Sequence, residues 1–384
     1  MPKLWMPKLS LFSSRNLPVL PLIVVLAGQL TAAQHLAAQQ GSAAQPAQNQ
    51  QPASGQQTGP SSQKPADQSS AGPPSGDQSQ EPVTTLKANV NVVQLFFNVK
   101  DKHGTLVPNL TKDDFEVAED SKPQTIKYFA AESNLPLTLG IMIDTSYSQR
   151  NVLDMEKEVG GAFLKQILTD KDEAYVISFD VSVDLLQDFT RDVHRLQKAL
   201  NGVRINTNYG GGPMPGAGGG PVPTSGLNVG TLLYDAVYLS SHDMLAKEVG
   251  RKAMILLTDG EDEGSKLKIK DAIEAAQKAD AMIYVLLCAD RGFYGGYGMG
   301  YSGESEMRKL TEQVGGRVIN VGNKFDKLRE AFDQIAAELR SQYNIGYTPT
   351  NTKLDGSYRK LEIKNKQSYK IQARAGYYAI ASQD

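Results

Sequence analysis

The chain has 384 residues, with 40 basic and 42 acidic side chains and a formal net charge of -2. It has no basic stripe, which excludes a surface built for nucleic acid. The single cysteine, Cys288, excludes an intrachain disulfide, and the four histidines are too scattered for a zinc site. The length suffices for two domains and a linker.

The first 33 residues have the composition of a secretory signal peptide. Lys3, Lys8 and Arg15 form a basic region, an apolar run covers residues 17–26, and small residues at 31–33 provide a cleavage site. A membrane-spanning helix needs roughly 20 apolar residues, about twice the length of this run. We therefore expect export to the periplasm, the cell surface or the extracellular space, with no membrane span after signal cleavage.

Two segments of different character come next. Residues 34–82 are dominated by Gln, Ala, Ser, Pro and Gly, which cannot bury enough apolar surface to offset the entropy of ordering. We expect a disordered linker there. Residues 83–134 alternate polar and apolar side chains around turn signals, which predicts the N-terminal part of a small β domain, with strands at residues 90–97, 106–107, 114–117 and 124–129.

Strand and helix patterns alternate along residues 135–341. This alternation predicts an α/β fold, a doubly wound and mostly parallel sheet flanked by helices on both faces. Strands are expected at residues 137–143, 174–179, 183–189, 253–257, 282–288 and 318–321. Helices are expected at residues 153–168, 193–200, 231–245, 269–278, 306–314 and 325–339.

The C-terminal residues 342–384 return to short strands, expected at residues 343–347, 359–363 and 369–374. This segment and residues 83–134 are each marginal in size for an independent hydrophobic core. We therefore expect the two flanks to pack together as one β-sandwich-like domain, with the α/β domain inserted between them.

Polar side chains follow the predicted strands at three places. Asp144, Ser146 and Ser148 come directly after one strand, Thr231 opens a helix, and Asp259 follows another strand. The carboxyl ends of parallel strands meet at one edge of a sheet, where ligands bind. Two carboxylates and three hydroxyls form an all-oxygen set that suits a hard divalent cation, Mg²⁺ or else Mn²⁺ or Ca²⁺. Side chains at alternate positions of an extended segment point the same way.

These residues resemble the metal-ion-dependent adhesion site of von Willebrand factor type A (VWA) domains, whose pattern is Asp-x-Ser-x-Ser, a distant Thr and a later Asp. The resemblance covers roughly residues 135–339, matches all five positions and implies a Rossmann-like fold. It implies a metal held by two acidic residues, one or both through water, by two serines directly, and by a threonine directly or through water, namely Asp144, Asp259, Ser146, Ser148 and Thr231.

The flanks are similar to a group of exported bacterial VWA-related proteins common in acidobacteria. The similar stretches are residues 107–115 before the α/β domain and residues 343–349 and 373–377 after it. That group has no well-defined activity, so this similarity implies nothing about a partner.

Each motif has a simpler interpretation when taken alone. Asp-x-Ser-x-Ser fits a capped turn, Thr231 fits a helix N-cap, and Asp259 with Gly260 fits a turn. Their conjunction at three strand ends favours the metal site. The acidic residues 261–263 fit a solvated loop, or else a second weak cation site or a repulsive rim. Cys288, between apolar neighbours, is interpreted as a buried core thiol.

Two glycine-rich segments, residues 206–227 and 290–303, border the same sheet edge. Long loops of this kind are functional or disordered, and tyrosine with glycine is typical of adaptable binding surfaces. We interpret them as a recognition rim around the metal. The alternative is that they are disordered loops without a binding role. The rim residues, including one that stands where the adhesion site often has glycine, are Tyr147, Tyr209, Phe293, Tyr294 and Tyr297. A glycine pattern at 298–303 fits a dinucleotide fingerprint but lies too far beyond the strand.

The function expected from these features is metal-dependent protein binding, in which the cation coordinates an Asp or Glu carboxylate of a partner protein. A metal-assisted hydrolase using the same cation is the first alternative. No histidine lies near the site in the sequence, and phosphate-loop and nucleophile-elbow signatures are absent. A scaffold with a purely structural metal is the second alternative. The oligomeric state is left open.

Overall fold

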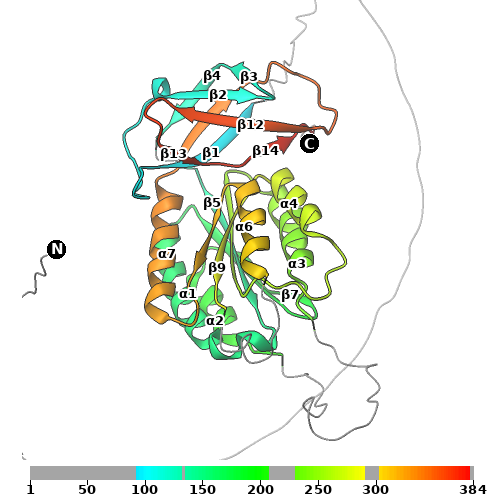
Figure 1. Ribbon diagram of the computed structural model, residues 1–384. Coiled ribbons are helices and arrows are strands. Elements are labelled where there is room, and N and C mark those ends of the chain that lie inside the picture. The colour runs from blue at the N-terminus through cyan, green and yellow to red at the C-terminus, as the bar shows by residue number, and fades with distance from the viewer. Residues whose placement is uncertain (1–91, 132–134, 207–229, 290–301, 381–384) are drawn as a thin grey trace, which may run out of the picture. The chain divides into compact units, whose positions relative to one another are not determined.

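The computed structural model describes residues 92–131, 135–206, 230–289 and 302–380 (Figure 1). Residues Val83–Asp384 form one compact unit. The expected signal peptide and linker lie outside the described residues, and the domain boundaries at 134/135 and 341/342 stay predictions.

The α/β region is built on a sheet of six strands, which are β5 (Leu137–Asp144), β6 (Glu173–Phe179), β7 (Val183–Thr190), β8 (Arg251–Thr258), β9 (Ala281–Leu287) and β10 (Arg317–Asn320). Their order is β10-β9-β8-β5-β6-β7, and only the edge strand β7 runs antiparallel to its neighbour. Every residue of β5 and β9 is buried. Burial on both sides is what helices on both faces of a parallel sheet produce.

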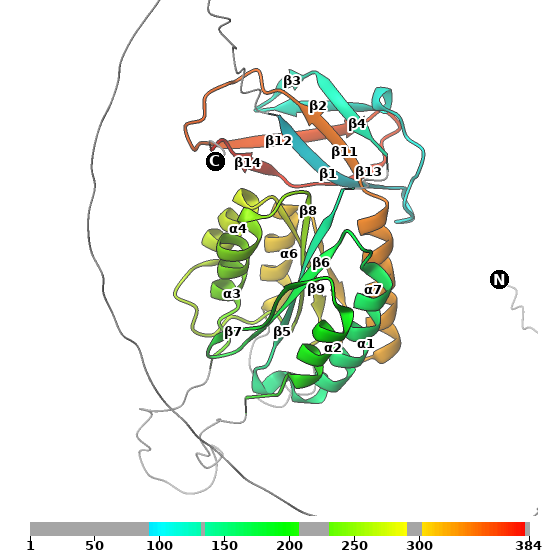
Figure 2. The ribbon, with the colours of Figure 1, turned by 180° about the vertical axis from the view of Figure 1, so that it is seen from behind.

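Helices cover both faces of this sheet (Figures 1 and 2). One face packs against α1 (Leu153–Ile167), α2 (Val193–Gly202) and α7 (Phe325–Arg340). The other face packs against α3 (Leu233–Leu239), α4 (Ile269–Lys278) and α6 (Gly303–Val314). The two hydrophobic cores lie on opposite sides of the sheet, so the predicted doubly wound architecture is confirmed.

In the described ranges, no helix has the length and apolar character that a membrane crossing requires.

The two flanks of the α/β region form two four-stranded antiparallel sheets. The strands are β1 (Val93–Lys100), β2 (Phe115–Glu119), β3 (Lys122–Gln124), β4 (Ile126–Ala130), β11 (Tyr343–Tyr347), β12 (Tyr358–Asn365), β13 (Lys370–Gln372) and β14 (Gly376–Tyr378). Their orders are β13-β1-β11-β4 and β14-β12-β2-β3. Each sheet combines strands from both flanks, with β1 pairing β11 and β2 pairing β12. The expectation that the flanks pack together is confirmed.

Some predicted element boundaries were wrong. Residues 106–107 form only an isolated bridge from Leu106 to Lys100, and the strand expected at 124–129 is divided between β3 and β4, which belong to different sheets. The helix expected from Thr231 begins two residues later, at Leu233, and changes after Leu239 to a π turn. The short strand β14 was not predicted, because its glycine and two tyrosines form too brief a pattern.

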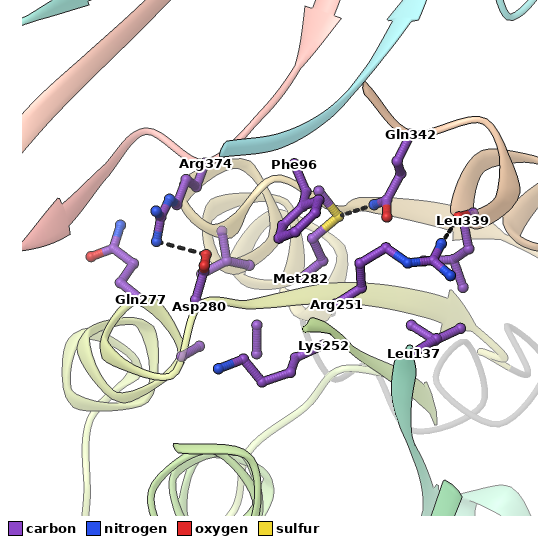
Figure 3. A pocket seen from close by; sticks show the side chains of 13 residues that line it. Phe96, Leu137, Arg251, Lys252, Gln277, Asp280, Met282, Leu339, Gln342 and Arg374 are labelled. Carbon is purple, nitrogen blue, oxygen red and sulfur yellow. Dashed lines mark hydrogen bonds and ion pairs between the residues drawn. The ribbon is translucent and has the colours of Figure 1, made fainter. Parts of the chain in front are cut away.

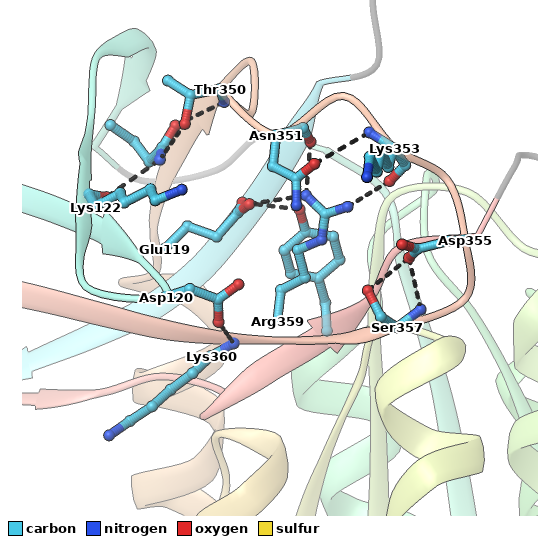
Figure 4. Close-up of polar contacts among 12 residues, drawn as sticks. Glu119, Asp120, Lys122, Thr350, Asn351, Lys353, Asp355, Ser357, Arg359 and Lys360 are labelled. Carbon is cyan, nitrogen blue, oxygen red and sulfur yellow. Dashed lines mark hydrogen bonds and ion pairs between the residues drawn. The ribbon is translucent and has the colours of Figure 1, made fainter.

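A buried ion pair joins the two flanks inside the β-sandwich. Arg359 donates through Nη1 to Glu119 Oε1 at 3.0 Å, and both side chains are at most 2% exposed. Tyr347 and Tyr377 donate their hydroxyls to Glu119 Oε2 at 2.7 and 2.9 Å. Arg359 also donates to main-chain carbonyls of the loop before β12, including that of Asn351 at 2.6 Å (Figure 4). The carboxylate is therefore compensated by three donors, as burial of a charge requires.

We expect Arg359→Met to lower the free energy of unfolding by about 3–5 kcal/mol, because Glu119 would remain buried without its cation. Urea unfolding at neutral pH measures this loss. The matched control is Lys364→Met on the same strand, whose ion pair with Glu362 is exposed on both sides. The control should change stability by at most about 0.5 kcal/mol. Equal losses of stability in the two variants would contradict a stabilising role of the buried ion pair between Arg359 and Glu119.

Candidate functional site

The carboxyl-terminal edge of the central sheet brings two aspartates together. Asp144 is the last residue of β5, and Asp259 directly follows β8. The two strands are parallel neighbours with Ile143 opposite Leu257, so the residues after this pair emerge side by side. The exposed fractions of Asp144 and Asp259 are 0% and 2%. Two carboxyl groups are thus buried next to each other at the edge where α/β proteins bind ligands.

Asp144 is fixed by two neutral donors. Its Oδ1 accepts from the main-chain N–H of Ser146 at 2.9 Å, and its Oδ2 accepts from the Thr258 hydroxyl at 2.6 Å. The Oγ atoms of Ser146 and Ser148 are 3.0 Å apart, so the two hydroxyls are turned to the same side. The two serines share a direction as predicted, but Ser148 lies in a 3₁₀ turn, Tyr147–Asn151, and not in the extended segment that we expected.

Gln149 links the serine segment to Asp259. Its Nε2 donates to Asp259 Oδ2 at 2.9 Å and lies 3.5 Å from Ser148 Oγ. The residue is fully buried in a 3₁₀ turn, η2 (Tyr147–Asn151). Neither Gln149 nor Thr258 was a predicted site residue. For Thr258, the available sequence signal was a hydroxyl side chain directly before Asp259. Gln149 can be recognised as part of the site only once the turn η2 that buries it is known.

Thr231 reaches the site through its main chain. Its N–H donates to Glu263 O at 2.8 Å and its carbonyl accepts from Glu263 N at 3.0 Å, which joins it to the loop after Asp259. The side chain is buried. The position before the first residue of α3 is Leu232, so Thr231 does not cap this helix. The structure therefore gathers Asp144, Ser146, Ser148 and Asp259 in one hydrogen-bonded network, with Thr231 on the adjoining bridge.

Burial and like charge dominate the electrostatics of this network. Burial, followed by repulsion from Asp259, raises the pKa of Asp144 to about 8, although its hydrogen bonds act in the opposite direction. Burial also raises the pKa of Glu156, on α1, to about 8, and the fields of Asp144 and Asp259 act in the same sense. Burial raises the pKa of the Cys288 thiol well above its usual value. Cys288 is fully buried, in agreement with a core thiol and against a nucleophile.

The acidic loop after Asp259 differs from the solvated loop we expected. Glu261 Oε1 accepts from the main-chain N–H groups of Ser302 and Gly303 at 2.6 and 2.7 Å, at the start of α6. Asp262 Oδ1 accepts from Tyr234 N at 3.1 Å, in the first turn of α3. Carboxylates at helix N-termini meet unpaired donors and the positive end of the helix dipole. These two side chains therefore anchor helices beside the site.

The residues present fit a hard divalent cation in their chemistry. Among residues 92–131, 135–206, 230–289 and 302–380, no group of three or more His, Cys, Asp or Glu side chains is arranged to hold a metal ion. A cation at Asp144 and Asp259 would therefore need hydroxyl and external oxygen ligands as well. The paired hydroxyls of Ser146 and Ser148 are neutral oxygen donors of the required type.

Of the expected rim, the structure describes Tyr147. Its side chain is 40% exposed, and the guanidinium carbon of Arg150 lies 4.4 Å from the ring centroid. The remaining rim residues, Tyr209, Phe293, Tyr294 and Tyr297, lie outside the described residues, as does most of both glycine-rich segments and of the glycine pattern at 298–303.

A small cavity lies where β1 and the short link between α7 and β11 meet the opposite end of the central sheet (Figure 3). Phe96, Met282 and Gln342 line it, together with an ion pair between Arg374 and Asp280 at 2.6 Å. Its volume is about 10 Å³. That volume holds about one water molecule, so the cavity is no alternative ligand site.

No family model matches the sequence, and no curated protein matches it. Among solved structures, the conserved hypothetical protein BatB from Bacteroides thetaiotaomicron is 16% identical over 53% of this chain and 100% of its own, with a TM-score of 0.37. The vWF domain of the type V pili tip protein Mfa5 from Porphyromonas gingivalis is 13% identical over 53% of this chain and 95% of its own, with a TM-score of 0.38.

A third similar structure is proximal thread matrix protein 1 from the mussel byssus, with a zinc-occupied MIDAS motif. It is 14% identical over 56% of this chain and 48% of its own, with a TM-score of 0.40. Of these three structures, the Mfa5 structure is the one described as a vWF domain.

We expect the metal-free protein to lose stability as the pH rises from about 5 to about 8.5. The pKa of Asp144 is raised from 3.8 to about 8 in the folded state, so its contribution is complete below pH 3.8 and is lost as the pH passes 8. One carboxyl group changes stability by at most about 1.4 kcal/mol per pH unit. Asp144→Asn should flatten the decline, as measured by urea unfolding in chelator across this range.

The control for this pH series is Asp154→Asn, which removes an exposed carboxylate from the same segment of chain. It should leave the decline unchanged. If the curves of the parent and Asp144→Asn run parallel across the range, the buried aspartate is not the titrating group.

Proposed function

We propose that the chain is an exported protein-binding module that depends on a divalent cation, and that it is not an enzyme. The observation that supports this proposal most is the burial of Asp144 beside Asp259, with the Ser146 and Ser148 hydroxyls turned together next to them. In the empty site, burial and the neighbouring carboxyl group oppose ionisation of Asp144, and a bound cation would compensate the charge of both carboxylates.

In this proposal Asp144 and Asp259 supply the negative charge, one or both through water, and Ser146, Ser148 and Thr231 supply neutral oxygens. Mg²⁺ is the expected cation, with Mn²⁺ or Ca²⁺ as substitutes, because all donors are oxygen. Two carboxylates balance a divalent charge, and when bound the cation would attract an Asp or Glu carboxylate of a partner protein. Gln149 and Thr258 hold the acidic pair in place through their hydrogen bonds to it.

The hydrolase alternative requires a general base near the cation. Of the histidines that the structure describes, His103 and His194 are exposed, and His242 stacks on Tyr238 and contacts Asp243. No hydrogen bond joins any of these three to the acidic pair. The burial of Cys288 and its raised pKa argue against thiol chemistry. Protein binding therefore has more support than hydrolysis.

We further propose that residues 1–33 direct export and are removed, and that residues 34–82 tether the folded part in the periplasm or at the cell surface. This proposal rests on the composition of those residues alone.

Calorimetric titration of the full-length chain with Mg²⁺, Mn²⁺ and Ca²⁺ tests the cation site. We expect saturable binding in the parent and its loss in Asp144→Ala and in Asp259→Ala, because each variant removes one of the two charges that balance the cation. The matched control is Asp154→Ala, since that carboxylate is exposed on α1. The control should bind like the parent.

Circular dichroism shows whether each variant is folded and separates the proposal from a structural metal. Variants that unfold together with the loss of the cation would support the scaffold alternative. A folded parent that binds none of the three cations would contradict the proposal. Turnover of a model ester or phosphate that requires the cation would support the hydrolase instead.

A further inference from the structure

A third carboxyl group is buried behind the acidic pair. Glu156 lies in the first turns of α1 and is 0% exposed. Among the described residues, neither of its carboxyl oxygens has a hydrogen-bond partner, and it takes part in no ion pair. The Cys288 thiol is its polar neighbour and favours the charged form, but makes no hydrogen bond of ordinary geometry with it.

The other buried glutamates that the structure describes are compensated, since Glu119 pairs with Arg359, and Glu338 pairs with Lys100 and Arg317. A buried carboxylate without a partner costs several kcal/mol, so buried acids are paired or face a metal. Without a partner among the described side chains, Glu156 is held in its neutral form in the metal-free protein, since burial raises its pKa to about 8, and a cation at the acidic pair would favour its ionised form.

Glu156 is related electrostatically to the acidic pair. Of the charged residues that the structure describes, Asp144 and Asp259 are those whose fields act on it. Gln149, which donates to Asp259, likewise keeps a buried Oε1 without a partner. Two unpartnered buried acceptors, one from η2 and one from α1, thus accompany the two aspartates. Among the described residues no three acids are arranged to hold a metal ion directly, and the proposal accordingly assigns Glu156 a place outside the ligand sphere.

We propose that Glu156 is a specificity-determining residue of the cation site, acting from outside the ligand sphere to favour cations of higher charge. This inference rests on the proposed cation site and deepens it. An ionised Glu156 near the two carboxylates would strengthen the attraction of the site for any cation. The gain would be larger for a trivalent ion than for a divalent one, because the coulombic energy is proportional to the charge of the ion.

The test compares Ca²⁺ with La³⁺, which share a preference for oxygen ligands, by calorimetric titration of the full-length chain. Glu156→Gln keeps the size of the side chain and removes its charge. We expect affinity to fall about tenfold for Ca²⁺ and about thirtyfold for La³⁺. The logarithms of these two losses then have the same ratio, about three to two for La³⁺ over Ca²⁺, as the charges of the ions. The matched control is Glu158→Gln, which removes an exposed charge two residues further along α1 and should change neither affinity.

Glu156→Asp serves as the conservative variant. It retains the charge, so it should keep the preference for La³⁺ over Ca²⁺ close to that of the parent even if both affinities fall. Equal losses for the two ions in Glu156→Gln would assign Glu156 a merely structural role and overturn the inference, as would unchanged affinities. A parent that binds neither ion would overturn the inference, and it would overturn the proposed function as well only if Mg²⁺ and Mn²⁺ also fail to bind. Binding in the parent with no effect of Glu156→Gln would overturn the inference alone.

Discussion

The parallel pairing of β5 with β8 is the constraint on which the site depends. Strands that are hydrogen-bonded neighbours in the same direction must end at the same edge, so Asp144 and Asp259 meet although they are far apart in the chain. Burial of β5 on both faces leaves no room for either carboxyl group to turn toward solvent. The sheet that stabilises the protein therefore also forces two carboxyl groups together in the interior.

The loops around this edge are held by the same type of interaction. Glu261 and Asp262 each accept main-chain N–H groups at the beginning of a helix, and Thr231 forms a main-chain bridge to Glu263. Acidic residues thus have two physical roles within a few positions of one another. Those at helix N-termini accept main-chain N–H groups and stabilise the fold, whereas those at the strand ends lie side by side in the interior and are the proposed cation ligands.

Much of this arrangement could be predicted from the sequence, because the periodic patterns that define buried strands and amphipathic helices are local. Asp144, Ser146, Ser148 and Asp259 were identified since each follows a strand whose end is visible in the pattern. Gln149 and Glu156 could not be found in this way. Their significance arises from burial and from the lack of partners, which depend on how η2 and α1 pack. The division of residues 122–130 between two sheets was also missed, since a strand that changes sheets has the pattern of one continuous strand.

The ion pair between Glu119 and Arg359 joins residues separated by 240 positions. The intervening chain must be synthesised before such a contact can form. Until then β1 and β2 are without their partners β11 and β12 and expose unpaired strand edges. Such edges are templates for intermolecular association. During synthesis from the N-terminus the chain therefore carries an aggregation hazard that ends only when β11 and β12 pair with β1 and β2.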